Sequence, residues 1–269
     1  MAEEEEKKEE VIETVEKQVL KGVKKKDSFD KETWKPKTEI GKKVKDGDVT
    51  DVDEILDKGI TILESGIVDV LLPGIDADLL LVGQSKGKFG GGQRRVFKQT
   101  QKKTQEGNKP HFATFAIIGD TEGHIGLGYG KSKETVPARE KAVRRAKLNV
   151  IKIIRGCGSW QCGCKEPHSI PFAVKGKCGS TSIELIPAPK GTGLCVEKEC
   201  QKMLKLAGIK DAWSKTKGQT KTKINLVNAC FDSLKNLIKM KTAHKYIGQL
   251  GIVEGKISKE EGNEEDSSN

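Results

Sequence analysis

HFATFAIIGDTEGHIGLGYGKS, residues 111–132, decides the fold of the first half of this chain. Two runs of β-prone residues flank a short segment at 119–123, which predicts two antiparallel strands joined by a tight turn. In the second run Gly126, Gly128 and Gly130 alternate with bulky residues, so the glycines share one strand face. A face without side chains indicates close approach of either the domain's own helix or a nucleic-acid backbone.

The same stretch ends in Gly-Lys-Ser, as nucleotide-binding loops of the Walker type do. Such a loop needs a glycine five residues before its Gly-Lys pair, and Ile125 stands at that position. A dinucleotide fingerprint starting at Gly126 and Gly128 would need a third glycine where Lys131 stands. The spacing therefore predicts no nucleotide cofactor.

An amphipathic helix is predicted directly after the second strand. Thr135 is placed to cap it, and Pro137 is tolerated in its first turn. Alanines and Val143 fall on its inward face, whereas its basic residues face mostly outward. The first half of the chain is therefore predicted to contain strand, strand and basic helix, preceded by a helix at 51–59 and a strand at 79–82.

Positive charge is concentrated in one part of the chain. The net charge is +10, but residues 84–155 alone hold 17 basic and 5 acidic residues, so the remainder is slightly acidic. Such a concentration indicates a polyanionic partner rather than an ordinary solvated surface. Because aromatic residues make up only 4% of the chain, the abundant Lys, Arg, Gln and Gly favour phosphate and sugar contacts with folded RNA over base stacking.

Composition divides the chain into two small α+β domains with charged tails. Residues 1–50 are charge-rich and are predicted to be disordered. Residues 51–156 form the first domain, which contains a long basic loop at 84–110. Residues 157–242 form the second domain, and 243–269 form an acidic tail for which no structure is predicted. We interpret the loop as an RNA-binding element, the alternative being a disordered linker.

The second domain is predicted to begin with two strands. They turn at 175–177 and are followed by a helix at 196–207, a strand at 212–217 and a closing helix at 224–240. Three cysteines are predicted to lie on apolar helix faces in the core: Cys195, Cys200 and Cys230.

Neither export nor membrane insertion is predicted. No apolar run approaches the roughly 18 residues of a membrane span. The amino terminus, MAEEEEKKEE, is acidic where a secretory signal would be basic and then apolar. We expect a cytoplasmic protein whose seven cysteines are thiols or metal ligands rather than a disulfide framework.

CGSWQCGCKEPH, residues 157–168, gathers four possible metal ligands: Cys157, Cys162, Cys164 and His168. Three thiolates and an imidazole would complete a closed, structural zinc shell. Against zinc stand the one-residue gap between Cys162 and Cys164 and the competing thiol of Cys178. Small packing thiols beside a hydrogen-bonded histidine are the alternative, and the sequence leaves both interpretations open.

Catalysis is not predicted from these residues. Nucleobase deaminases combine His-x-Glu with Pro-Cys-x-x-Cys, and the chain contains neither pattern, nor His-Glu-x-x-His. The sequence therefore predicts a protein that is not an enzyme. A free RNA-binding chaperone or translational regulator shares the charge pattern and stays an alternative.

Eight segments occur in a characteristic order: KTQEGNKP, IIGDTEGHIGLGYGKSKETVPA, RRAKLNVIKI, RGCGSWQCGC, EPHSIPF, GKCGS, IPAPKGTGL and LAGIKDAWSKTKGQT. In this order, over about residues 51–240, the chain resembles the universal small-subunit ribosomal protein five family in its archaeal-type form. The resemblance implies a first domain like double-stranded-RNA-binding domains and a second that is a left-handed βαβ unit. It does not imply zinc, because bacterial and eukaryotic members generally lack the triple cysteine.

The resemblance also implies a structural role in the small ribosomal subunit, with contributions to assembly and decoding accuracy. The implied partners are ribosomal RNA, messenger RNA near the channel by which it enters, and small-subunit proteins four and eight. By similarity, the basic loop runs into ribosomal RNA near the decoding region, and PKGTGL lies near the interface with protein four. The candidate protein-interface residues are Lys190, Gly191, Thr192 and Gly193. The candidate RNA-binding residues are Lys86, Lys88, Arg94, Arg95, Lys98, Lys102, Lys103, Lys109, Lys131, Lys133, Arg144, Arg145, Lys147 and Arg155.

Overall fold

The computed structural model describes residues 31, 33–85 and 93–256. The predictions for residues 1–30 and 257–269, and for Lys86 and Lys88, lie outside these residues. The helices are α2 (Glu39–Asp46), α3 (Val52–Asp57), α4 (Ser65–Leu71), α5 (Thr135–Leu148), α6 (Lys198–Leu206), α7 (Lys223–Lys239) and α8 (His244–Leu250). The strands are β1 (Asp76–Leu79), β2 (Lys98–Thr104), β3 (Gly107–Gly119), β4 (His124–Ser132), β5 (Val150–Lys152), β6 (Ile154–Arg155), β7 (Val174–Cys178), β8 (Thr181–Pro187), β9 (Leu194–Cys195), β10 (Ala212–Lys217) and β11 (Val253–Glu254).

The first sheet is built around the long strand β3. Its order is β1-β3-β4-β5, and β2 pairs with the outer part of the same β3 edge that β1 uses. The predicted hairpin is confirmed, because β3 and β4 pair from Phe112 opposite Ser132 to Gly119 opposite Ile125. The strand predicted at 79–82 ends at its first residue, since β1 covers Asp76–Leu79.

Helix α5 covers one face of this sheet, and its backbone packs directly against the backbone of β4. A Cβ added at Gly128 would lie 2.1 Å from the carbonyl oxygen of Ala142, and one added at Gly130 would lie 2.1 Å from that of Ala138. The glycine face of β4 is thus filled by the domain's own helix and is closed to RNA. The helix itself is confirmed, but its N-cap residue is Glu134 and Thr135 is its first residue.

The second domain is a four-stranded sheet backed by two helices. Its order is β7-β8-β10-β9, with β9 and β10 parallel and α6 between them in sequence. The predicted strand β10 and helices α6 and α7 are confirmed. The predicted turn at 175–177 is wrong, because those residues lie within β7 and the chain reverses at Gly179 and Ser180. Cys195 is exposed in β9 instead of being part of the core.

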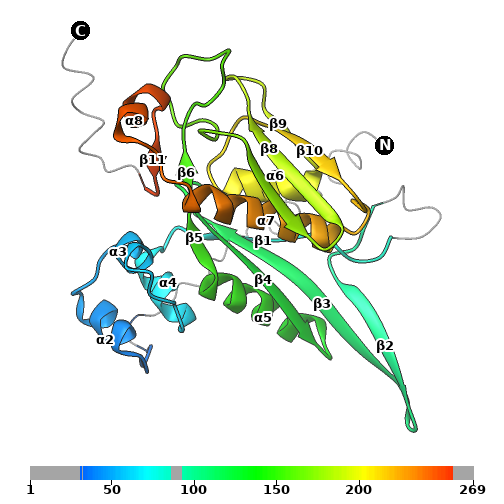
Figure 1. Cartoon of the computed structure of the whole chain (residues 1–269). Coiled ribbons are helices and arrows are strands. Elements are labelled where there is room, and N and C mark those ends of the chain that lie inside the picture. The colour runs from blue at the N-terminus through cyan, green and yellow to red at the C-terminus, as the bar shows by residue number, and fades with distance from the viewer. Residues whose placement is uncertain (1–30, 32, 86–92, 257–269) are drawn as a thin grey trace, which may run out of the picture.

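The two domains share one core. Layers follow one another from α5 through the first sheet and the pair α6 and α7 to the second sheet (Figure 1). Leu127 of β4, Met203 of α6 and Leu234 of α7 belong to the same buried cluster. Helices α6 and α7 therefore connect the sheets, and the domains are fixed relative to each other.

Structure extends further towards both ends than the sequence predicts. Helix α2 lies within the predicted disordered extension, and its Val44 packs in a satellite cluster with Ile67 and Val68 of α4. The predicted acidic tail includes α8 and β11, and β11 pairs with β6. Both corrections have one cause, because these short segments gain their order from distant partners rather than from local apolar periodicity.

Replacing Gly128 with Ala is expected to destabilise the fold. The new Cβ would collide with helix backbone, which cannot move aside as a flexible side chain can, so we expect a loss of about 2 kcal/mol or more in unfolding free energy. Chemical denaturation measures the loss. Gly74→Ala is the matched control, since nothing lies within 4 Å of its added Cβ, and equal stability of the two variants would contradict this packing.

Candidate RNA-binding arm and metal cluster

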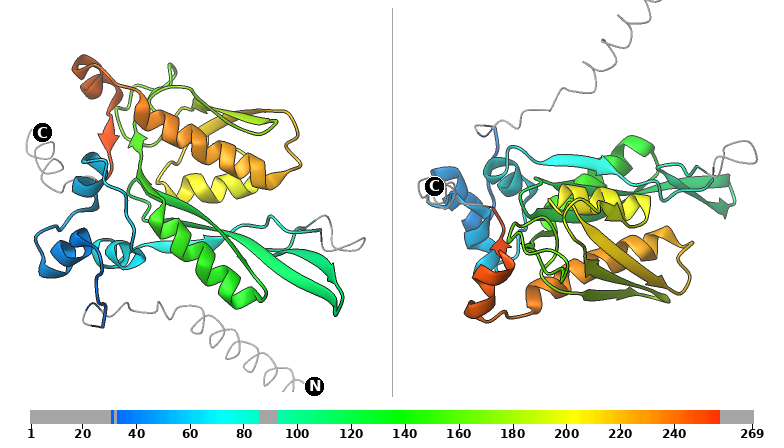
Figure 2. Two further views of the ribbon diagram at one scale, coloured as in Figure 1. Left: turned by 60° about the horizontal axis from the view of Figure 1, so that its bottom comes forward. Right: turned by 90° about the horizontal axis from the view of Figure 1, so that it is seen from above.

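A two-stranded arm projects from the first sheet. Strand β2 and the outer part of β3 pair from Lys98 opposite Ala113 to Thr104 opposite Gly107. Figures 1 and 2 show this hairpin extending well beyond helix α5 and the rest of the sheet. The loop predicted at 84–110 is thus wrong for its second half, and residues 86–92 lie outside the described part. Strand β2 could not be predicted from the sequence, because KQTQKKT has no alternation of apolar and polar residues.

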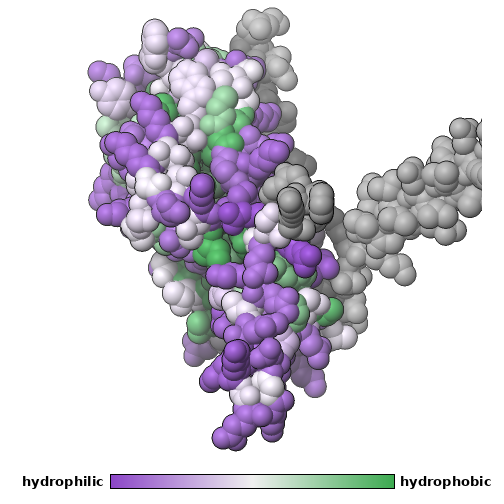
Figure 3. Space-filling view, turned by 90° about the vertical axis from the view of Figure 1, so that its right-hand side faces the viewer, coloured by the Kyte–Doolittle hydropathy of each residue, from purple (hydrophilic) through white to green (hydrophobic). Residues whose placement is uncertain are grey.

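The arm, which we define as Gln93–Ala113, is basic and polar. Lys102 and Lys109 lie directly opposite each other on the two strands. Because both side chains are positively charged, they repel each other and destabilise this strand pair. Glu106 forms an ion pair with Lys109 at 2.7 Å, but both side chains are largely exposed. The projecting lower part of Figure 3 is mostly hydrophilic. The predicted RNA-binding residues on the arm are Arg94, Arg95, Lys98, Lys102, Lys103 and Lys109.

The base of the arm is attached to both domains. Arg94 Nη2 donates to the carbonyl oxygen of Lys221 at 2.9 Å, which connects the arm to the second domain. Gly83 of the first domain lies directly against the backbone of the arm, since its added Cβ would be 2.3 Å from the carbonyl oxygen of Phe97. Arg94 therefore anchors the arm, and one of its guanidinium N–H groups is already bonded within the protein.

Other predicted RNA-binding residues continue the basic surface beside the arm. Lys131 and Lys133 are exposed where β4 leads into α5, and they line one cavity with His111 of β3. Arg144 and Arg145 are exposed on the outer face of α5.

Two predicted RNA-binding residues do not belong to this surface. Lys147 is half-buried and its ammonium contacts Asp69 of α4 at 2.5 Å. Arg155 is 6% exposed, and its Nη2 donates to the carbonyl oxygens of Glu122 at 2.7 Å and Gly255 at 2.9 Å. Burial lowers the pKa of Arg155. The prediction for Arg155 is wrong because the C-terminal segment covers it.

His124 lies at the junction between helix α3 and the β3–β4 turn, where it is placed between two carboxylates. Its Nδ1 is 2.5 Å from Asp120 Oδ2 and its Nε2 is 2.8 Å from Asp53 Oδ1. Burial alone would lower the pKa of His124, but the hydrogen bonds and charges of Asp120 and Asp53 outweigh burial and raise this pKa to about 9. The protonated imidazole therefore joins α3 to the β3–β4 turn.

The predicted metal ligands come together at the opposite end of the molecule from the arm. Ligand atoms of Cys157, Cys162, Cys164 and His168 all lie within 4.8 Å of one another. The Sγ of Cys164 is 3.3 Å from that of Cys162 and 3.6 Å from that of Cys157. His168 Nε2 is 3.8 Å from Cys162 Sγ. The four donor atoms thus lie close enough together to hold one metal ion.

The surroundings orient these ligands. His168 Nδ1 lies 2.9 Å from Asp211 Oδ2, which leaves Nε2 to face the thiols. Backbone N–H groups of Lys190 and Cys164 lower the pKa of Cys162 to about 6, whereas burial raises the pKa of Cys157 to about 11. Cys178, the competing ligand, lies elsewhere, beside α7.

Known proteins match both the arm and the second domain. The family described as Ribosomal protein S5, N-terminal domain, matches residues 93–154, and Ribosomal protein S5, C-terminal domain, matches 176–245. Small ribosomal subunit protein uS5 of Nanoarchaeum equitans is 48% identical over 226 residues, which is 84% of this chain and 97% of that protein. The protein of the same name from Methanocaldococcus jannaschii is 45% identical over 229 residues, or 85% of this chain and 99% of that protein. The chain belongs to the ribosomal protein S5 family.

In this S5-family chain the predicted protein-interface segment adjoins the cluster. Lys190 Nζ contacts Glu166 at 2.7 Å, and Glu166 belongs to the segment 157–168 that carries the four cluster residues, which we call the cluster loop. Gly193 N donates to Asp211 Oδ1 at 2.7 Å, so one carboxylate holds both His168 and this segment. Gly191 also belongs to the segment, with φ at 88°. Sequence reasoning missed Asp211, whose only signal would have been an acidic residue directly before a predicted strand.

Among the described residues, no helix is long and apolar enough to cross a membrane.

Raising the pH is expected to weaken the junction at His124. Because its folded pKa of about 9 exceeds the ordinary value of 6.5, its stabilising contribution is complete below about pH 6.5 and is lost as the pH rises to about 9. The contribution amounts to about 3 kcal/mol at most. Urea unfolding across this range measures it. His124→Gln is the control, and an equal pH dependence in the variant would show that the histidine does not carry the effect.

Proposed function

We propose that this S5-family chain is a structural component of the small ribosomal subunit in the cytoplasm, and that its arm binds ribosomal RNA. The observation that carries the proposal is the arm itself, a projecting hairpin with exposed lysines and hardly any apolar surface to bury. Phosphates would relieve the repulsion between Lys102 and Lys109. Relatives named small ribosomal subunit proteins support the same assignment.

The proposed surface is wider than the arm. It includes the exposed residues Lys131, Lys133, Arg144 and Arg145 beside it, and excludes the buried Arg155. Contacts to phosphates and sugars would position the chain on folded RNA without reading bases. A non-enzymatic role agrees with this arrangement. Family membership favours it over a chaperone or regulator acting outside the ribosome.

Finer details of the placement are also proposed. The arm would lie near the decoding region, close to the channel by which messenger RNA enters. The segment Lys190–Gly193 would contact ribosomal protein four, and protein eight would be a further neighbour. Since Asp211 and Glu166 hold this segment on the cluster loop, its shape would depend on the cluster. This dependence would connect the cluster to decoding accuracy.

We further propose that Cys157, Cys162, Cys164 and His168 hold a structural zinc ion. The donors suit zinc, because three soft thiolates and one imidazole form a closed tetrahedral shell. The carboxylate of Asp211 on the far nitrogen of His168 is the partner that zinc-bound histidines ordinarily have. The ion would hold together residues on both sides of the loop at 158–161, which exposes the side chain of Trp160.

Charge reversal on the arm tests the RNA assignment. Lys102→Glu with Lys103→Glu is expected to weaken binding to small-subunit ribosomal RNA and to reduce its salt dependence, by about one unit of slope for each lysine. Filter binding at several salt concentrations measures both quantities. The matched control is Lys42→Glu with Lys43→Glu on α2, which are also exposed. If both double variants bound like the original chain, the arm would not be the RNA-binding element.

Elemental analysis tests the metal. The chain purified without chelator is expected to contain about one zinc ion. Cys162→Ser with Cys164→Ser is expected to abolish it, because two of the four ligands are removed. Cys195→Ser is the control, since that exposed thiol lies outside the cluster. A metal-free original chain, or an equal zinc content in all three proteins, would contradict the assignment.

A further inference from the structure

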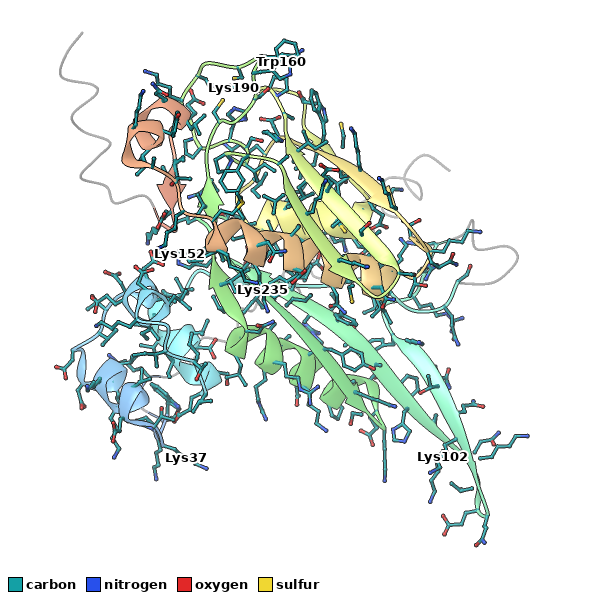
Figure 4. All side chains as sticks on the ribbon, in the orientation of Figure 1. Lys37, Lys102, Lys152, Trp160, Lys190 and Lys235 are labelled. Atoms are coloured by element: carbon teal, nitrogen blue, oxygen red, sulfur yellow. The ribbon has the colours of Figure 1, made fainter. Side chains whose placement is uncertain are left out.

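An open cavity of about 610 Å³ lies between the first sheet and helix α7. Strands β3 and β4 supply one wall, and α7 with the end of β7 supplies the other. Figure 4 shows Lys235 of α7 between this helix and the strands of the first sheet. We call this cavity the interdomain groove. It is separate from the arm and from the cysteine cluster.

The groove has aromatic walls. The rings of Phe115 and Tyr129 lie 4.9 Å apart between centroids, and Phe231 of α7 lies across from them. Tyr129 is 38% exposed whereas Phe115 is 5% exposed, so a ligand would meet the tyrosine ring first. Phe231 is 5% exposed as well, so Tyr129 supplies the accessible ring for stacking and the two buried phenylalanines support it from behind and across the cavity.

Polar groups surround these rings with an excess of positive charge. Lys177 and Lys235 line the groove, and Lys235 Nζ lies 4.9 Å from the centroid of the neighbouring phenylalanine ring. Asn149 and Asn228 contribute amides, which both donate and accept hydrogen bonds. Asp232 is the one acidic residue among the described lining residues, and its carboxylate accepts a hydrogen bond from the Lys177 backbone at 3.4 Å.

We propose that the interdomain groove binds one unpaired nucleotide of RNA. The base stacks on Tyr129, the asparagine amides meet its polar edge, and Lys177 and Lys235 meet the phosphate. Bases splayed out of folded RNA are recognised by this combination of ring, amide and cation. Asn149 Nδ2 already donates to the carbonyl oxygen of Leu127 at 3.0 Å, which leaves the amide oxygen of Asn149, the amide of Asn228 and the two ammonium groups to meet a polar ligand. An apolar side chain of a neighbouring protein would use the rings but would not match these polar groups. The inference rests on the proposed RNA-binding function but uses a different surface.

Photo-crosslinking of the full chain tests the site. The probe is an unstructured RNA hexamer with a central 4-thiouridine, irradiated with the purified protein and mapped by mass spectrometry. We expect the crosslink on peptides that contain Tyr129 or Phe231. In a separate titration, Tyr129→Leu is expected to weaken hexamer binding about tenfold, because stacking on the ring is lost while apolar volume is kept. Tyr129→Phe should retain binding.

Two controls separate the groove from the rest of the molecule. Trp160→Ala removes an aromatic side chain that is 88% exposed, outside the groove, and should leave the groove crosslink unchanged. Lys177→Glu with Lys235→Glu changes lysines on the rim and should abolish the crosslink. Crosslinks confined to other peptides, or unchanged binding by both groove variants, would overturn the proposal.

Repeating the irradiation in reconstituted small subunits, with 4-thiouridine in their RNA, tests the partner. A crosslink from ribosomal RNA to the groove supports the proposal. Contact of the groove with a neighbouring protein, and no RNA crosslink there, would overturn it. If no RNA crosslink forms at the groove while the Lys102→Glu with Lys103→Glu variant still loses ribosomal RNA binding, the proposed function stands without this site. If neither surface responds, the proposed function fails as well.

Discussion

The contact between helix α5 and strand β4 is the constraint on which the rest of the structure depends. Because Gly126, Gly128 and Gly130 have no Cβ, the helix backbone lies directly on the strand. The long basic side chains of α5 therefore face outward, and the bulky side chains of β4 face the second domain. The second domain uses the same device, since an added Cβ at Gly176 would lie 2.1 Å from the carbonyl oxygen of Ala229 in α7. In each domain a helix thus packs with its backbone directly against a strand, α5 against β4 and α7 against β7. The shared core lies between these two helix–sheet pairs.

The shared core holds the two candidate sites far apart. The basic arm lies at one end, with Lys102 near its tip, and the cysteine cluster lies at the other, near Trp160 and Lys190 (Figure 4). Buried charges fasten the connecting segments, because Arg155 binds the C-terminal segment and Asp211 binds both His168 and Gly193. A displacement of the cluster loop would therefore reach the Lys190–Gly193 segment directly, whereas the arm depends on its own contacts at its base.

The sequence predicted those elements whose signal is local. The β3–β4 hairpin, the helix α7 and the glycine face all follow from residues within one turn or one strand of each other. The clustering of Cys157, Cys162, Cys164 and His168 was predicted for the same reason, since these residues lie within a dozen residues of sequence. Strand β2 was not predicted, because both of its faces are polar and it forms a strand only by pairing with the outer part of β3. Arg155 was misassigned and Asp211 was missed because their roles depend on Gly255 and His168, 100 and 43 residues away.

The central claim is that the arm of this S5-family chain lies against RNA in the small subunit. Acetylation of lysines in intact small subunits, compared with the free chain and read by mass spectrometry, tests it most directly. The account predicts that Lys102, Lys103 and Lys109 react in the free chain and are protected in the subunit. Treatment of the subunit with ribonuclease should restore their reactivity. Full acetylation of these three lysines in the intact subunit would contradict it.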